Sequence, residues 1–242
     1  MCNINMKFLF LFLNLFFSSL LIGNEVEYKS LEKINGLFFE SYSNVPFTGK
    51  VIGSTQGNII KGKKEGKFLK YYDNGQLLSK IHYKNNKIHG ETYEFYRNGN
   101  LLSKKNYQED ELNGKYSDYY SMGQLLSKRN YKNGKLEGEY LDYYKNGQLH
   151  NKKNYKDGKL EGESLTYHEY EMQKISQLKH KSFYNKGKLE GQYILYDENG
   201  QLRERGIYIA GKLEGEYMQY NKNGKLIETR IYKDGMLVNT IK

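Results

Sequence analysis

A glycine recurs every 24 residues along most of this chain, and this spacing limits the folds that the sequence can adopt. The glycines are Gly66, Gly90, Gly114, Gly138 and Gly162, followed by Gly191 after 29 residues and Gly215 after another 24. An aromatic residue stands five positions after each glycine, at Tyr71, Phe95, Tyr119, Tyr143, Tyr167, Tyr196 and Tyr220. Columns of leucine and of a second tyrosine keep the same register through all seven units. Such a period is typical of a repeat protein in which each unit packs mainly on its neighbours.

Each unit contains two turn signals. An Asn-Gly pair follows one tyrosine-rich segment, as at Asn146-Gly147, and a second pair follows the other tyrosine, as at Asn133-Gly134 and Asp157-Gly158. Asn-Gly and Asp-Gly supply the positive φ values that tight hairpin turns need. The segments between the turns are rich in Tyr, Leu and Ile, which favours strands over helices. The sequence therefore predicts an all-β fold, an elongated and twisted antiparallel meander of β-hairpins with two strands per 24-residue repeat.

The glycine inside the recurring motif KLEGEY falls within a predicted strand, where glycine normally weakens the structure. Such a glycine marks a β-bulge or a close approach by a neighbouring group. Because a tyrosine column lies nearby, we expect a ring to pack over the bare backbone of these glycines. A glycine loop with a binding function is the alternative, but no helix follows that would form a phosphate site.

The composition fits a thin sheet better than a conventional globular core. The 242 residues include 25 Tyr and 25 Gly but only 1 Pro and no Trp, and hydrophobic residues make up 38%. Tyrosine combines a large apolar ring with a hydroxyl that water can solvate, so it can hold together a sheet that has no deep core. The aromatic content of 15% argues against a disordered chain.

The first 23 residues differ from the rest of the chain. Lys7 is followed by an apolar run from Phe8 to Phe17 and then by small residues before the polar segment NEVEYK. This is the layout of a secretory signal peptide at residues 1–23, with cleavage near Gly23. An uncleaved membrane anchor is the alternative. Cys2, the one cysteine, precedes the apolar run, so a mature chain would have no disulfide framework.

Two other segments depart from the repeat. Residues 24–65 hold a degenerate first repeat and the sole proline, and we expect them to cap the first edge of the sheet ahead of the array at 66–242. The turn at 169–176 is expanded by five residues. It is either a tolerated loop insertion or a protrusion that contacts a partner through Glu169, Tyr170, Glu171, Met172, Gln173 and Lys174.

No pattern of catalytic, cofactor-binding or metal-ligating residues stands out. The histidines lack the spacing of a zinc site, and Ser79, Ser103 and Ser127 recur in one strand column, which indicates structural positions. The acidic residues of the LEGE motifs alternate with lysines and are assigned to the solvated face. The net charge of +10 is spread along the chain, which argues against a nucleic-acid site. We therefore predict a protein that is not an enzyme and needs no cofactor.

The unit YKNGKLEGEYLDYYKNGQL, repeated from about Gly66 to Val238, resembles the MORN repeat in the variant form common in bacterial proteins. The segment GLFFESYSNVPFTGKV (Gly36–Val51) is similar to the start of the bacterial YwqK-like antitoxin family, which carries such repeats. The resemblance implies an elongated sheet of hairpins and a role in protein or membrane association.

The leading hypothesis is an exported, non-enzymatic scaffold for interactions with another protein or with an envelope surface, since repetition supplies many equivalent contacts. An antitoxin-like inhibitor that neutralises a partner toxin is a second hypothesis, and association with anionic lipid surfaces is a third. The expected location is the periplasm, the cell envelope or the medium, or the membrane if the leader stays attached.

Overall fold

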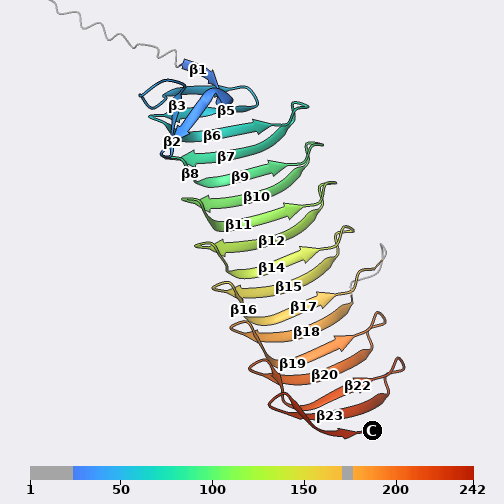
Figure 1. The fold of residues 1–242 in the computed structure, drawn as a ribbon. Coiled ribbons are helices and arrows are strands. Elements are labelled where there is room, and N and C mark those ends of the chain that lie inside the picture. The colour runs from blue at the N-terminus through green and yellow to red at the C-terminus, as the bar shows by residue number, and fades with distance from the viewer. Residues whose placement is uncertain (1–23, 171–176) are drawn as a thin grey trace, which may run out of the picture.

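The computed structural model describes residues 24–170 and 177–242, which form a ladder of antiparallel strands that curves and twists along its length (Figure 1). The prediction of an all-β array of hairpins is confirmed. No helix in the described ranges is long and apolar enough to cross a membrane. The predicted signal peptide lies outside the described residues, and so do residues 171–176 of the expanded turn, which include Glu171, Met172, Gln173 and Lys174.

The N-terminal segment contains five short strands and one turn of 3-10 helix. They are β1 (Asn24–Glu27), η1 (Tyr28–Ser30), β2 (Leu31–Ile34), β3 (Leu37–Glu40), β4 (Gly49–Ile52) and β5 (Thr55–Ile60). Strand β1 pairs in parallel with β4, and β2 and β3 form a separate hairpin. Strand β1 thereby occupies the hydrogen-bonding edge of β4 that the rest of the sheet leaves open.

Seven units follow, numbered here from the glycines Gly66 to Gly215, and each pairs an outgoing strand with a return strand. The outgoing strands are β6 (Lys63–Tyr71), β8 (Lys87–Ile88) with β9 (Gly90–Phe95), β11 (Glu111–Tyr119), β13 (Lys135–Leu136) with β14 (Gly138–Tyr143), β16 (Lys159–Leu160) with β17 (Gly162–Tyr167), β19 (Lys188–Tyr196), and β21 (Lys212–Leu213) with β22 (Gly215–Tyr220). The return strands are β7 (Leu77–Lys84), β10 (Leu101–Gln108), β12 (Leu125–Lys132), β15 (Leu149–Lys156), β18 (Leu178–Asn185), β20 (Leu202–Ile209) and β23 (Leu226–Lys233), and β24 (Met236–Ile241) pairs with β23.

The unit glycines lie at bulges, where the outgoing strand changes register. Their φ values run from +74° at Gly215 to +106° at Gly114, a region that residues with a Cβ rarely adopt. At Gly66, Gly90, Gly138, Gly162 and Gly215 an added Cβ would have no neighbouring atom within 4 Å. The expectation that a tyrosine ring covers these glycines is therefore wrong, and the reason for glycine is its backbone conformation.

A ring does lie against bare backbone at two glycines outside that column. A Cβ at Gly57 would approach the Phe68 ring to 2.7 Å, and a Cβ at Gly206 would approach the Tyr217 ring to the same distance. In five of the units the rings pack on one another, because the tyrosine opposite the unit glycine lies close to the aromatic residue two positions after that glycine. The centroids of Tyr116 and Tyr131, for example, are 5.9 Å apart.

The two turns of each unit differ in backbone conformation. In the second turn both central residues have positive φ, as at Asn133 (+49°) and Gly134 (+71°), which is the type I′ geometry expected. In the first turn only the glycine has positive φ, as at Gly75 (+82°), and Gly75 N–H donates to the Tyr72 carbonyl at 3.0 Å. This pattern fits a type I turn followed by a glycine bulge, in which the glycine alone supplies the positive φ.

Backbone bonds at the second turns join each unit to the one before it. Gly134 N–H donates to the Leu112 carbonyl at 2.9 Å, and Gly158 N–H donates to the Leu136 carbonyl at 2.9 Å. A glutamate next to the unit glycine accepts a further bond, as when Asp157 N–H donates to Glu137 Oε2 at 3.0 Å. Equivalent bonds reach the half-buried glutamates Glu65, Glu161, Glu190 and Glu214. These acids were assigned to the solvated face, but they are structural acceptors.

The one compact apolar core among the described residues lies at the N-terminal end. It contains the buried side chains Phe38, Phe47, Val51, Ile59 and Phe68. The first two come from the segment that precedes β4, and Phe68 comes from unit 1. The N-terminal segment therefore covers the start of the repeat sheet, and the later units continue as a single layer (Figure 1).

Replacing Gly138 with Ala should lower the free energy of unfolding by about 1–2 kcal/mol, because alanine must adopt a left-handed backbone. Gly138→Asn should lower it less, since asparagine visits that region more readily. Thermal and urea unfolding followed by circular dichroism would measure both. A larger loss for asparagine than for alanine would show that the space above Gly138 is limiting and would contradict this account.

Candidate binding face

The single-layer sheet presents two faces with different chemistry. The first, the tyrosine face, holds each unit glycine and the residues two and four positions after it, together with their partners on the return strands. Its aromatic members are Phe68, Tyr83, Tyr107, Tyr116, Tyr131, Tyr140, Tyr155, Tyr184, Tyr193, Tyr208, Tyr217 and Tyr232. The opposite side, the lysine face, carries one row of basic side chains.

Aromatic rings pair within each of five units of the tyrosine face. The centroid distances run from 5.2 Å for Phe68 and Tyr83 to 6.2 Å for Tyr217 and Tyr232, and the rings are tilted or edge-on. Offset and edge-on rings at these distances attract one another beyond the area that they bury. Unit 5 lacks such a pair, because Ser164 stands where the other units from 3 to 7 have tyrosine.

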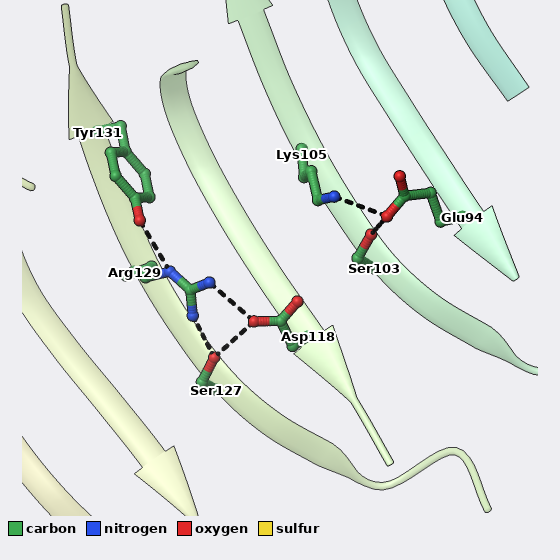
Figure 2. A network of polar contacts seen from close by, with 7 residues as sticks. All are labelled: Glu94, Ser103, Lys105, Asp118, Ser127, Arg129 and Tyr131. Atoms are coloured by element: carbon green, nitrogen blue, oxygen red, sulfur yellow. Dashed lines mark hydrogen bonds and ion pairs between the residues drawn. The ribbon is translucent and has the colours of Figure 1, made fainter. Parts of the chain in front are cut away.

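Acidic and basic side chains alternate between these rings. In unit 2 the Glu94 carboxylate accepts hydrogen bonds from Lys105 Nζ at 2.6 Å and from Ser103 Oγ at 2.8 Å (Figure 2). Burial alone would raise the pKa of the Glu94 carboxyl, but these two bonds outweigh it and the pKa is lowered. The network is therefore ionised at neutral pH and fixes the position of both charged side chains.

Unit 3 contains a larger network centred on the Arg129 guanidinium. Figure 2 shows it directed at Asp118, Ser127 and Tyr131, with Nη2 2.8 Å from Asp118 Oδ2, Nη1 2.5 Å from Ser127 Oγ and Nε 3.2 Å from the Tyr131 hydroxyl. The guanidinium carbon also lies 3.8 Å from the centroid of the Tyr116 ring. A carboxylate, hydroxyls and a ring face thus hold one half-buried cation, with 14% of the Arg129 side chain exposed.

A second cation is enclosed by rings at the N-terminal end of the same face. The Lys64 ammonium lies 4.9–5.6 Å from four centroids, those of Tyr28, Phe38, Phe68 and Tyr83. The quadrupole of each ring attracts a cation placed over its face. The tyrosine face therefore provides an environment suited to cationic side chains in more than one unit.

A ladder of tyrosine hydroxyl bonds runs along the first turns. The hydroxyls of Tyr72, Tyr96, Tyr120 and Tyr144 donate at 2.7–2.9 Å to backbone carbonyls of the following units, at Phe95, Tyr119, Tyr143 and Tyr167 respectively. His168 takes the next place and lies 3.2 Å from the Tyr196 carbonyl through Nε2. The aromatic residues five positions after the unit glycines, which the sequence singles out, therefore supply the acceptor carbonyls. The donor hydroxyl belongs to the next residue along the chain, in the preceding unit.

The sequence contains the signal for this ladder, because a second tyrosine follows the first with the same period. In units 6 and 7 this second column holds Asp197 and Asn221 in place of tyrosine. Their side-chain oxygens accept hydrogen bonds from backbone N–H groups of their own turns. Asn146 and Tyr170 link the expanded turn to unit 4, because Asn146 Nδ2 donates to the Tyr170 carbonyl at 2.8 Å. The Tyr170 hydroxyl also donates to the Glu198 carbonyl, while Glu169 is exposed.

The lysine face carries one basic residue per unit in a row across the strands. The row contains Lys80, Lys104, Lys128, Lys152, Lys181 and Arg205, about 10 Å apart because two strands separate successive members. Three of the six form ion pairs with acids of the same face, Glu91, Glu139 and Glu163, at 2.6–3.5 Å. These pairs reduce the positive charge that the row offers to a partner.

The described residues contain no group of three or more His, Cys, Asp or Glu side chains that could hold a metal ion. His168 and Glu169 lie at the base of the expanded turn, and the third member of the sequence cluster, Glu171, lies outside the described residues. The buried column serines Ser103 and Ser127 donate to carboxylates.

Taken together, these features define an extended β-hairpin repeat protein with one aromatic, charge-paired face. The family model of the MORN repeat variant matches residues 64–85, 88–109, 112–133, 136–157, 189–210 and 213–234. These matches cover just over half of the chain, which therefore belongs to the MORN repeat variant family. The matched segments leave out unit 5, which carries the expanded turn. A search of curated proteins found no match to the chain.

MORN repeats are generally interaction modules for proteins or lipids, and their all-β repeat fold is typically non-catalytic. The resemblance to the MORN repeat is thus confirmed. The finer resemblance of Gly36–Val51 to the YwqK-like antitoxin family stays a prediction.

Replacing Tyr120 with Phe should lower the free energy of unfolding by about 1 kcal/mol, because the Tyr143 carbonyl loses its hydroxyl donor. Tyr119→Phe is the matched control, since its hydroxyl forms no hydrogen bond within the described part of the chain. Thermal unfolding of both variants measures the difference. Equal losses for the two would show that the hydroxyl ladder does not join the units.

Proposed function

We propose that this protein is an exported, non-enzymatic scaffold that binds another protein through its tyrosine face. The observation that carries the proposal is that units 2 to 7 repeat this face, while the N-terminal segment covers it only at unit 1. Half-buried tyrosines and a stacked arginine are the side chains that most often supply binding energy at protein interfaces. Repetition along the sheet lets a long partner make several equivalent contacts.

The acidic and basic pairs of this face favour a protein partner over a uniformly charged surface. Glu94 pairs with Lys105 in unit 2 and Asp118 pairs with Arg129 in unit 3, so the local charge changes sign within each of these two units. A partner must match that alternation, which gives specificity more than raw affinity. An antitoxin-like inhibitor of a partner toxin would be one case of such protein binding.

Association with an anionic lipid surface is the second candidate, and the row of six basic residues on the lysine face favours it. Ile207 and Ile209, which are 48% and 53% exposed near its C-terminal end, would add apolar contact. Each unpaired basic residue contributes about 1 kcal/mol near an anionic membrane, and ion pairs already engage half of the row. The lysine face is therefore the weaker of the two surfaces.

The chain itself suggests how to remove each face without disturbing the fold. Ser164 replaces the tyrosine in unit 5, so Tyr116→Ser with Tyr140→Ser should be tolerated. Thr229 replaces the basic residue in unit 7, so Lys80→Thr with Lys128→Thr is the matched control for the lysine face. Circular dichroism would check that both double variants keep the β-sheet signal.

We expect affinity capture from envelope extracts to recover a saturable protein partner with the wild type and with the lysine-face variant. The tyrosine-face variant should lose that partner, because the ring surfaces are gone. Loss with the lysine-face variant alone, together with binding to phosphatidylserine vesicles at low salt, would support the lipid candidate and contradict ours. Finding no saturable partner with the wild type would also count against the proposal.

Export rests on residues 1–23, and we propose that the leader is removed near Gly23. The protein expressed from its full sequence should then leave the cytoplasm, and N-terminal sequencing should give a start close to Asn24. Full-length protein in the membrane fraction would contradict cleavage and support the anchored alternative. Full-length protein that stays in the cytoplasm would contradict export.

A further inference from the structure

Unit 3 shows how the tyrosine face holds a guanidinium, and unit 4 repeats the receptor residues with lysine in place of arginine. The Arg129 guanidinium of unit 3 also lies 5.9 Å from the centroid of the Tyr140 ring. In unit 3 the receptor groups around Arg129 are Tyr116, Asp118, Ser127 and Tyr131. One repeat later the equivalent residues are Tyr140, Asp142, Asn151 and Tyr155, as the strand register shows. The two ring pairs have nearly the same spacing: the centroids of Tyr140 and Tyr155 are 6.0 Å apart, and those of Tyr116 and Tyr131 are 5.9 Å apart.

The residue that differs is the cation. Lys153 stands in the register of Arg129, and within the described residues it forms no ion pair with Asp142 or with any other acid. Asp142 instead accepts hydrogen bonds from Asn151 Nδ2 at 3.0 and 3.2 Å and lies 3.0 Å from His150 Nδ1. His150 takes the place of the leucine found in the three preceding units, so this arrangement is specific to unit 4.

The negative charge of Asp142 is only partly offset. Its side chain is 17% exposed, Asn151 is neutral, and the imidazole of His150 carries a charge only when it is protonated. The pKa values of Tyr120, Tyr140 and Tyr144 are all raised, first by burial and, in smaller part, by the Asp142 carboxylate, to which the Glu169 carboxylate adds at Tyr120 and Tyr144. A carboxylate this deeply set normally has a paired cation, because burying an unpaired charge is costly.

A cavity of about 330 Å³ lies beside this carboxylate. Its lining includes Asp118, Arg129, Tyr140, Asp142, Tyr144 and His150. Since Asp118 and Arg129 form their own ion pair, Asp142 sets the remaining charge of the cavity. The Tyr144 and His150 rings, 4.3 Å apart, form one aromatic wall, and Tyr140 supplies another ring.

We propose that this cavity, which combines the Asp142 carboxylate with aromatic walls, binds an arginine side chain of a protein partner. The proposal rests on the proposed function, since it names the group that such a partner would present to the tyrosine face. Arginine fits better than lysine because a planar guanidinium can stack on a ring and bond a carboxylate through two N–H groups at once. One unit away, the Arg129 guanidinium carbon lies 3.8 Å from the centroid of the Tyr116 ring, and Arg129 Nη2 pairs with Asp118 Oδ2 at 2.8 Å.

The test is an NMR titration of the folded protein with the peptide acetyl-Gly-Arg-Gly-amide. A single side chain should bind with a dissociation constant of about 1 mM or weaker, within the range of a titration, and should shift the signals of His150 and Tyr144. The same peptide with citrulline, which keeps the shape and lacks the charge, should not bind. Equal binding of the two peptides would overturn the proposal.

Two variants locate the effect. Asp142→Asn keeps the shape of the carboxylate and should weaken arginine-peptide binding at least tenfold, whereas Glu139→Gln, on the opposite face of the same strand, should leave it unchanged. If Asp142→Asn binds the peptide as the wild type does, the cavity is not an arginine site.

The two proposals fail separately. If the partner is captured through the tyrosine face and Asp142→Asn retains it with unchanged affinity, the arginine site is rejected while the proposed function stands. If the peptide binds at Asp142 but no partner depends on Tyr116 and Tyr140, the cavity recognises a guanidinium and the scaffold proposal is rejected.

Discussion

The hydrogen bonds that join each turn to the preceding or following unit hold this array together. A single-layer sheet buries few apolar side chains, and the compact apolar core here is confined to the N-terminal segment. Along the rest of the sheet the second-turn bonds to Leu112 and its equivalents join successive units at one end of the strands. At the other end the hydroxyls of Tyr72 to Tyr144 join units 1 to 5. These contacts require the positive φ of the turn and bulge glycines, which explains why the glycine period is so strict.

Because hydrogen bonds at the turns hold successive units in register, the side chains on the two faces of the sheet can differ from unit to unit. Unit 5 has serine in place of a ring, unit 4 has His150 in place of leucine, and unit 3 has Arg129 where unit 4 has Lys153. Each of these changes alters the tyrosine face while the strands and their register continue. A regular scaffold can therefore carry local sites such as the cavity beside Asp142.

The period and the turn signals in the sequence were sufficient to predict the all-β hairpin array, since spacing and turn chemistry decide strand number and direction. The role of the unit glycines was predicted wrongly, because a bulge and a ring-covered glycine give the same sequence signal. The glutamates that accept turn bonds and the hydroxyl ladder from Tyr72 to Tyr144 depend on which units stack in register. The contacts of Asp142 depend in addition on the bulge between Asp142 and Tyr143.

Carboxyl labelling of the protein alone and in complex with its captured partner tests most directly whether the tyrosine face is the binding surface. Asp142 and Glu139 lie on the same strand and point to opposite faces, so they can be compared within one sample. We predict that carbodiimide labelling, read by mass spectrometry, falls at Asp142 in the complex and stays constant at Glu139. Protection of Glu139 with unchanged labelling of Asp142 would place the partner on the lysine face and contradict the account.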